Sequence, residues 1–260
     1  MGSFRDLIKN VFTTNRLVKR LNRKDHLRML EEVESYAPVI SRYLPYFNEL
    51  SNTEKARFLQ RVYRFKKKKT FHYIGIERNS EIPILISAAA IQISFGLKKY
   101  RMQYFKNIYI TADMYTYGLS SQPWVGHVNR NGIYISWKHF IYGYAHGHDR
   151  NNVGIHEMAH ALEYVATLDS IRADGHFVRN FSDYKILCEK IMRDLKGETP
   201  PLFTTQGMTN FHEFWAECAE LFFENPTDLH QHYPALYEAT RVLLNQDPMN
   251  GFAGMSEPRI

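Results

Sequence analysis

One segment of the sequence has the residue types and spacing to bind a metal ion and use it. Residues 153–163 read Val-Gly-Ile-His-Glu-Met-Ala-His-Ala-Leu-Glu, so His156 and His160 are four positions apart. Side chains at this spacing lie on one face of a helix, one turn from each other. Two such imidazoles can bind one zinc ion, and Glu157 can act as general base on the attacking water. On the motif alone, a pair of histidines on an ordinary amphipathic helix remains the alternative.

A catalytic zinc site also needs a third protein ligand. The spacing His-x-x-Gly-x-x-His does not supply it, because Glu163 and Ala166 stand at those places. The segment 210–223 carries glutamates at i, i+4 and i+7, namely Glu213, Glu217 and Glu220. Such a stripe is typical of a solvent-exposed surface, but facing residues 153–163 it could supply a ligand and acceptors for the histidine N–H groups. Glu163, one turn after His160, could be such an acceptor too.

Periodicity and turn residues predict an α+β fold with a helical N-terminal part. Strands are predicted where β-branched and aromatic residues alternate, over 71–76, 107–111 and 132–137. Helices are predicted over 35–69, 82–97, 152–168, 176–195, 211–224 and 233–246. Ser51 and Glu54 have the spacing of a capping box, and residues 113–131, rich in Gly, Ser, Pro and Asn, are predicted to form a loop.

Two regions are expected, a basic amphipathic helical segment over 1–34 and an α+β domain over 35–260 that contains the candidate zinc site. In the first, apolar residues from Phe4 to Phe12 recur at spacings of three and four among scattered lysines and arginines. We expect this helical segment to pack on the rest of the protein, and its docking to a membrane surface or a protein partner is the alternative. No signal-peptide core is present, and the interrupted apolar stretch at 82–97 is too short for a transmembrane helix.

The composition is that of an ordinary globular protein with a mild excess of positive charge. The 260 residues are 44% hydrophobic and include 33 Lys and Arg against 27 Asp and Glu, a net charge of +6. This excess does not indicate nucleic-acid binding, although the lysine run at 66–69 is the sequence's candidate for it. Only two cysteines are present, which excludes a disulfide framework and favours a reducing compartment, the cytoplasm.

These motifs together resemble the MtfA family of zinc peptidases (Mlc titration factor A), which is similar in its core to lethal-factor-type metalloproteases. The similarity runs from about residue 43 and includes segments 44–69, 132–137, 156–163, 213–216 and 220–226. The resemblance implies that residues 35–260 form a zinc-dependent peptidase domain with a zincin-like fold. It also implies one Zn²⁺ held by His156, His160 and Glu213, with Glu157 as base. Short peptide substrates, aminopeptidase activity, and binding of a transcriptional regulator are implied by the same resemblance.

The sequence departs from the family pattern near the expected oxyanion site. The family has a tyrosine seven residues before the glutamate ligand, and here that position is Gln206. A glutamine amide can donate a hydrogen bond but has no titratable proton, so Gln206 or a neighbour such as His212 is the oxyanion candidate. The alternative function is a weakly active, zinc-stabilised protein that binds a transcription factor.

Two further expectations concern the substrate cleft. The strand near residues 133–137 is predicted to pair with an extended peptide, as an edge strand can. His139, His146 and His148 fall in a predicted loop before the HExxH helix, where they could line the cleft or be ordinary polar loop residues.

Overall fold

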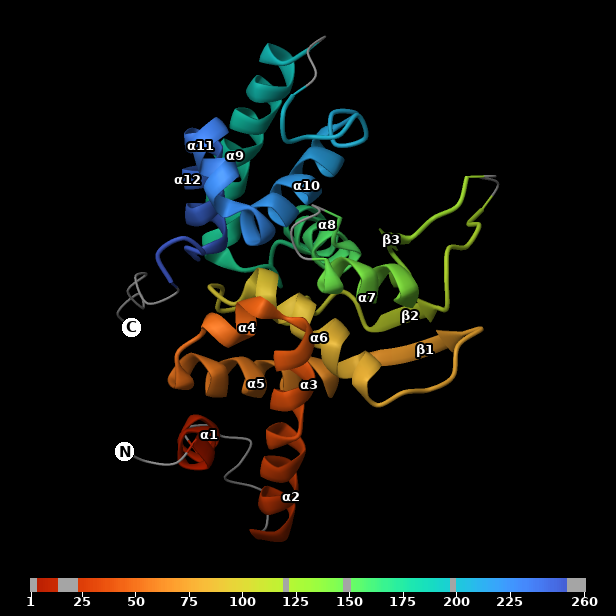
Figure 1. The fold of residues 1–260 in the computed structure, drawn as a ribbon, viewed down its shortest axis with the longest axis vertical. Coiled ribbons are helices and arrows are strands. Elements are labelled where there is room, and N and C mark those ends of the chain that lie inside the picture. Colours follow the sequence, from red (N-terminus) through yellow and green to blue (C-terminus); the bar gives the residue numbers. More distant parts are fainter. Residues whose placement is uncertain (1–3, 14–22, 119–121, 147–150, 197–199, 252–260) are drawn as a thin grey trace.

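The computed structural model describes residues 4–13, 23–118, 122–146, 151–196 and 200–251. The protein has an α+β, zincin-like fold in which helices predominate (Figure 1). The helices are α1 (Phe4–Thr13), α2 (Arg23–Glu34), α3 (Tyr36–Tyr43), α4 (Pro45–Glu49), α5 (Asn52–Lys66), α6 (Glu81–Ser94), α7 (Trp137–Ala145), α8 (Val153–Leu168), α9 (Gly175–Asp194), α10 (Phe211–Glu224), α11 (Pro226–His232) and α12 (Pro234–Leu244). The strands are β1 (Thr70–Ile74), β2 (Asn107–Thr111), β3 (Gly126–Asn129) and β4 (Gly132–Ser136).

The four strands form one mixed sheet in the order β1-β2-β4-β3. β1, β2 and β4 are parallel, and β3 runs antiparallel to β4. One face carries fully buried isoleucines, Ile108, Ile110, Ile133 and Ile135. The other carries a row of rings stacked from strand to strand at 4.2–4.6 Å, made by His72, Tyr109, Tyr134 and His127. The alternation of the strands therefore gives one core face and one aromatic face.

The predicted strands are confirmed to within two residues at each end, but the prediction of a continuous loop over 113–131 is wrong. β3 lies within it, pairing with β4 across a turn at Arg130 and Asn131. β3 reads Gly-His-Val-Asn, with one β-branched residue, so pairing with β4 rather than propensity makes it a strand. The loop expected before the HExxH helix is in part α7, which begins directly after β4.

The helical segment predicted over 35–69 is interrupted twice. Pro45 is the first residue of α4, since proline has no amide hydrogen to continue α3. Ser51 then caps α5: its hydroxyl accepts from the Glu54 amide at 3.3 Å, and the Glu54 carboxylate accepts from the Ser51 amide at 2.9 Å. The predicted capping box is confirmed.

The predicted buried helix is α6, and it lies at the centre of the protein (Figure 1). Nearly every residue of α6 is inaccessible to solvent, and its sides contact α3, α5 and α8. The Gln246 amide donates to the carbonyls of Gln92 and Ile93, at 3.1 and 3.0 Å, which satisfies acceptors at the end of the helix. α8 therefore rests on a rigid apolar support.

The N-terminal segment contains two helices rather than one. α1 packs on α5, where Ile8 is fully buried and the Gln60 amide donates to the Val11 carbonyl at 2.6 Å. Arg5 pairs with Glu34 at 3.0 Å, at the end of α2. The basic amphipathic helix thus packs on the body of the protein, and no helix among the described residues is long and apolar enough to cross a membrane.

The lysine run after α5 is largely occupied by contacts within the protein. Lys66 and Lys67 both pair with Glu32, at 3.0 and 3.2 Å. Lys69 is half-buried and donates to the carbonyls of Arg101 and Met102, both at 2.8 Å. These contacts give Lys66, Lys67 and Lys69 a structural role, which weakens the nucleic-acid hypothesis, whereas Lys68 is exposed.

Candidate metal centre

Two capped helices bring the candidate ligands together. The Asn152 side chain caps α8 by accepting from the Ile155 amide at 3.0 Å. The Asn210 side chain caps α10 by accepting from the amides of His212 and Glu213, at 2.9 and 3.1 Å. The buried Trp215 indole donates to the Ala159 carbonyl at 2.9 Å, which ties α10 to α8. Glu213 consequently faces the histidines of α8.

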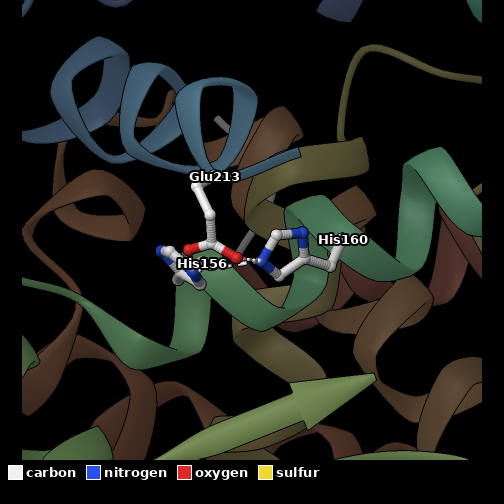
Figure 2. A group of neighbouring side chains, drawn as sticks. All are labelled: His156, His160 and Glu213. Carbon is white, nitrogen blue, oxygen red and sulfur yellow. Dashed lines mark hydrogen bonds and ion pairs between the residues drawn. The ribbon is translucent and has the colours of Figure 1, made fainter. Parts of the chain in front are cut away.

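Figure 2 shows His156, His160 and Glu213 pointing toward one another from α8 and α10. The two histidine Nε2 atoms are 3.1 Å apart, and the Glu213 carboxylate oxygens lie 3.4 Å from His156 Nε2 and 3.6 Å from His160 Nε2. Donor atoms of a tetrahedral zinc with bonds of about 2.0–2.1 Å are about 3.3–3.4 Å apart. Two imidazoles and one carboxylate at these separations would suit a single zinc ion as its three protein ligands.

The charges around the three donors also favour a cation. Burial disfavours the imidazolium of His156, but the carboxylates of Glu213 and Glu220 outweigh it and raise the pKa of His156 well above its usual value. Contact with His156 lowers the pKa of Glu213 to about 2, against the opposing effect of burial. The field that stabilises a proton on His156 would stabilise a divalent ion at the same place.

Glu220 positions His156 and the start of α8. Its Oε1 accepts from His156 Nδ1 at 2.7 Å, and its Oε2 accepts a short hydrogen bond from the Asn152 amide. The carboxylate is buried, with the side chain 5% exposed. Because Nδ1 is occupied, the Nε2 atom of His156 is the one directed toward His160 and Glu213.

Glu157 is a buried carboxylate next to the three donors. Its residue is 3% exposed, and its Oε2 has no hydrogen-bond partner among the described residues. Burial raises the pKa of Glu157 to about 8; Glu213 and Glu220 act in the same direction, and His156 opposes them. A carboxyl group with such a pKa can both take up and release a proton near neutral pH.

Gly126 of β3 gives Glu157 the room it needs. A Cβ added at Gly126 would lie 2.4 Å from Glu157 Oε1 and 2.6 Å from its Cγ. We expect Gly126→Ala to displace the flexible carboxylate, lower peptide hydrolysis about a hundredfold, and leave metal content unchanged. Hydrolysis rates and elemental analysis check this. Gly175→Ala is the control, because a Cβ added there would lie at an ordinary contact distance, 3.4 Å, from the Arg179 side chain. A Gly126→Ala protein with wild-type activity would contradict it.

The remaining predicted site residues have other partners. Glu163, buried on α8, accepts from His212 Nδ1 at 2.6 Å and not from a histidine of the metal centre. The Glu217 carboxylate accepts hydrogen bonds from the backbone amide of Thr204, at 2.9 Å, and from the Thr204 hydroxyl. The amide of Gln206 donates to Glu213 Oε2 at 3.1 Å, so it contacts the candidate metal ligand itself.

The metal centre opens into a cleft of about 1050 Å³. α8, β3, the start of α10 and the turn at 204–206 form its walls. His139 lies on α7, outside these walls, and its ring is hydrogen-bonded to the Ser136 hydroxyl. His146, the residue that follows α7, is also outside them, and His148 is not among the described residues. His127 of β3 also lines the cleft, and the sequence did not indicate it. Its place could have been inferred only by first predicting β3 as a strand.

The strand that faces the cleft is β3 and not β4. β4 lies between β2 and β3, so the prediction that residues 133–137 pair with a peptide is wrong. The Val125 carbonyl accepts from the Ser136 amide at 2.8 Å, and antiparallel pairing alternates. The backbone groups of Gly126 and Val128 therefore point away from β4, at the outer edge of the sheet.

The comparison with known families agrees with this geometry. Residues 18–243 match the sequence profile of the glucose-regulated metallo-peptidase M90 family. The chain belongs to this family. The match includes both α8 and α10, so this M90 protein is a metallopeptidase and the His-His-Glu group lies in its matched region. A comparison with curated proteins finds no match.

Proposed function

We propose that this M90 protein is a zinc peptidase in which His156, His160 and Glu213 hold the ion and Glu157 is the general base. The observation that carries the proposal is the convergence of two imidazole nitrogens 3.1 Å apart with the Glu213 carboxylate, whose Oε2 and Oε1 lie 3.4 and 3.6 Å from them, beside a buried carboxylate oxygen that has no partner among the described residues. Zinc, when bound, supplies a Lewis acid that acidifies water and polarises the scissile carbonyl.

Side-chain and backbone groups of the protein transfer the proton and bind the substrate. Glu157 removes a proton from the attacking water and delivers it to the leaving amine, which its raised pKa permits. Gly126 and Val128 offer outward backbone groups to an extended peptide, which would add a strand beside β3. Pairing with this edge would bring the scissile bond to Glu157, because Gly126 lies directly against it.

His212 is the better placed of the two oxyanion candidates. Gln206 donates its amide hydrogen to Glu213, so that group is engaged in positioning a ligand. The His212 side chain lines the cleft next to Glu213, is 64% exposed, and is held at Nδ1 by Glu163. The Nε2 side of its ring is left to face a substrate carbonyl.

The predicted effect of His212→Ala follows from this assignment. We expect kcat to fall about 10²–10³-fold while zinc content stays unchanged, the usual loss for one oxyanion donor. Gln206→Ala, measured in parallel, should cost less in kcat and more in zinc affinity, since its partner is Glu213. A larger kcat loss in Gln206→Ala than in His212→Ala would reverse the two roles.

Elemental analysis of the purified wild-type protein, with peptide hydrolysis assayed on the same sample, tests the proposed function. Stoichiometric zinc with cleavage supports the peptidase, and assays with free and acetylated N-termini decide whether it is an aminopeptidase. Stoichiometric zinc without cleavage would favour the weakly active regulator of a transcription factor. Absence of zinc would overturn both.

The free, buried Cys188 and Cys218 agree with our expectation of a cytoplasmic location.

A further inference from the structure

The charge of the cleft differs from that of the whole protein. The chain has a net charge of +6, yet the cleft is lined by five glutamates and by no lysine or arginine among the described residues. These glutamates are Glu157, Glu163, Glu213, Glu217 and Glu220. Even with a divalent ion in place and Glu157 protonated, the four other glutamates leave the cleft with an excess of negative charge. A cleft of one sign concentrates the field and attracts substrates of the opposite sign.

Four of the five carboxylates have partners or roles at the metal centre. Glu213 contacts both histidines, Glu220 holds His156, and Glu163 holds His212. The fourth, Glu157, is the buried base, with an unpartnered oxygen beside the cleft. These four groups leave Glu217 as the carboxylate that the proposed mechanism does not use.

Glu217 is held in a fixed place by neutral groups. Its two oxygens accept from the backbone amide and the hydroxyl of Thr204, and no ion pair between described residues includes it. The following turn closes tightly around it, since a Cβ added at Gly207 would lie 2.1 Å from Glu217 Oε2. The Glu217 carboxylate is half-buried and already ordered by neutral donors, so binding a ligand there costs little side-chain entropy.

We propose that Glu217 selects substrates with a basic side chain, lysine or arginine, within one or two residues of the scissile bond. This inference rests on the proposed peptidase function and names its substrate class. Glu217 follows Glu213 by one turn of α10, and side chains at that spacing start about 5–6 Å apart. A long basic side chain near a carbonyl at the metal centre can therefore reach the Glu217 carboxylate.

Matched peptides test this preference in the zinc-loaded protein. The peptides of one set are identical except at one position, which carries lysine, norleucine or glutamate. Four such sets place this position at each of the two residues on either side of the cleaved bond. We expect wild type to cleave the lysine peptide with a kcat/KM at least about tenfold above norleucine at one position, and glutamate to be poorest. In Glu217→Gln the lysine-to-norleucine ratio should fall to about 1–3. Glu49→Gln, an exposed change on α4, should keep the wild-type ratio.

Two further arms separate charge selection from a merely structural role and from failure of the proposed function. Thr204→Val loosens the turn but keeps the charge, so it should keep most of the preference; equal loss in Thr204→Val and Glu217→Gln would overturn the proposal. Glu157→Gln should bind peptides without cleaving them. Calorimetry with this variant should give tighter binding of lysine peptides than of norleucine peptides, and the difference should shrink as the salt concentration rises. Equal affinities there, or equal ratios in wild type and Glu217→Gln, would also overturn it. If wild type cleaves no peptide, the proposed function fails, and the same calorimetry with Glu217→Gln added to Glu157→Gln still decides the role of Glu217.

Discussion

Glu157→Gln should retain wild-type zinc content and hydrolyse peptides about a thousandfold more slowly. The glutamine amide is nearly the same size as the carboxyl group, so the buried site next to Gly126 can accommodate it. It cannot accept a proton from water, and general-base catalysis typically contributes 10²–10⁴-fold. The histidines and Glu213 are unchanged, so the metal site should persist.

The measurement combines elemental analysis with steady-state hydrolysis on the same preparation. Glu49→Gln removes an equal charge from an exposed position on α4 and should behave as wild type in both assays. Wild-type turnover in Glu157→Gln would show that another group is the base. Joint loss of zinc and activity would assign Glu157 a role in metal binding instead.

Glu213→Ala should lose zinc and activity together. Removing the carboxylate leaves two imidazoles, whereas catalytic zinc sites use three protein ligands. We expect zinc affinity to fall at least about a hundredfold and hydrolysis to become undetectable at limiting zinc. The backbone of α10 should not change, because its cap is the Asn210 side chain and Trp215 still bonds Ala159.

Competition with a chromophoric chelator gives the zinc affinities, and circular dichroism monitors the fold. Glu238→Ala on α12, an exposed acid outside the cleft, is the matched control and should bind zinc as wild type. Full zinc occupancy in Glu213→Ala at limiting metal would exclude Glu213 as the third ligand. A loss of helical signal would show instead that the variant perturbs α10.

Much of the helical framework could be predicted from local sequence. The segment around His156 and His160 has a helical apolar pattern, and α8 and α10 lie within about two residues of the predicted ranges. Ser51 and Glu54 predicted the start of α5, because a capping box depends on only a few consecutive residues. Membership in a metallopeptidase family could also be recognised from motifs that are short and ordered along the chain.

The layout of the cleft could not be predicted in this way. β3 has weak strand propensity and becomes the edge of the sheet only by pairing with β4. Two acids of the glutamate stripe illustrate the same limit: Glu220 meets His156, whereas Glu217 meets Thr204, a residue outside the helix. Helical spacing gives the face of a side chain but not the partner across the interface.

That two imidazoles share a helix face beside a glutamate follows from local sequence alone, because residues four apart in a helix are neighbours whatever surrounds them. By contrast, the packing of distant segments places the Glu213 carboxylate oxygens 3.4 and 3.6 Å from those imidazoles and puts Gly126 where it leaves room for Glu157. These distances join segments far apart in the chain, and they depend on how α10 and β3 pack against α8.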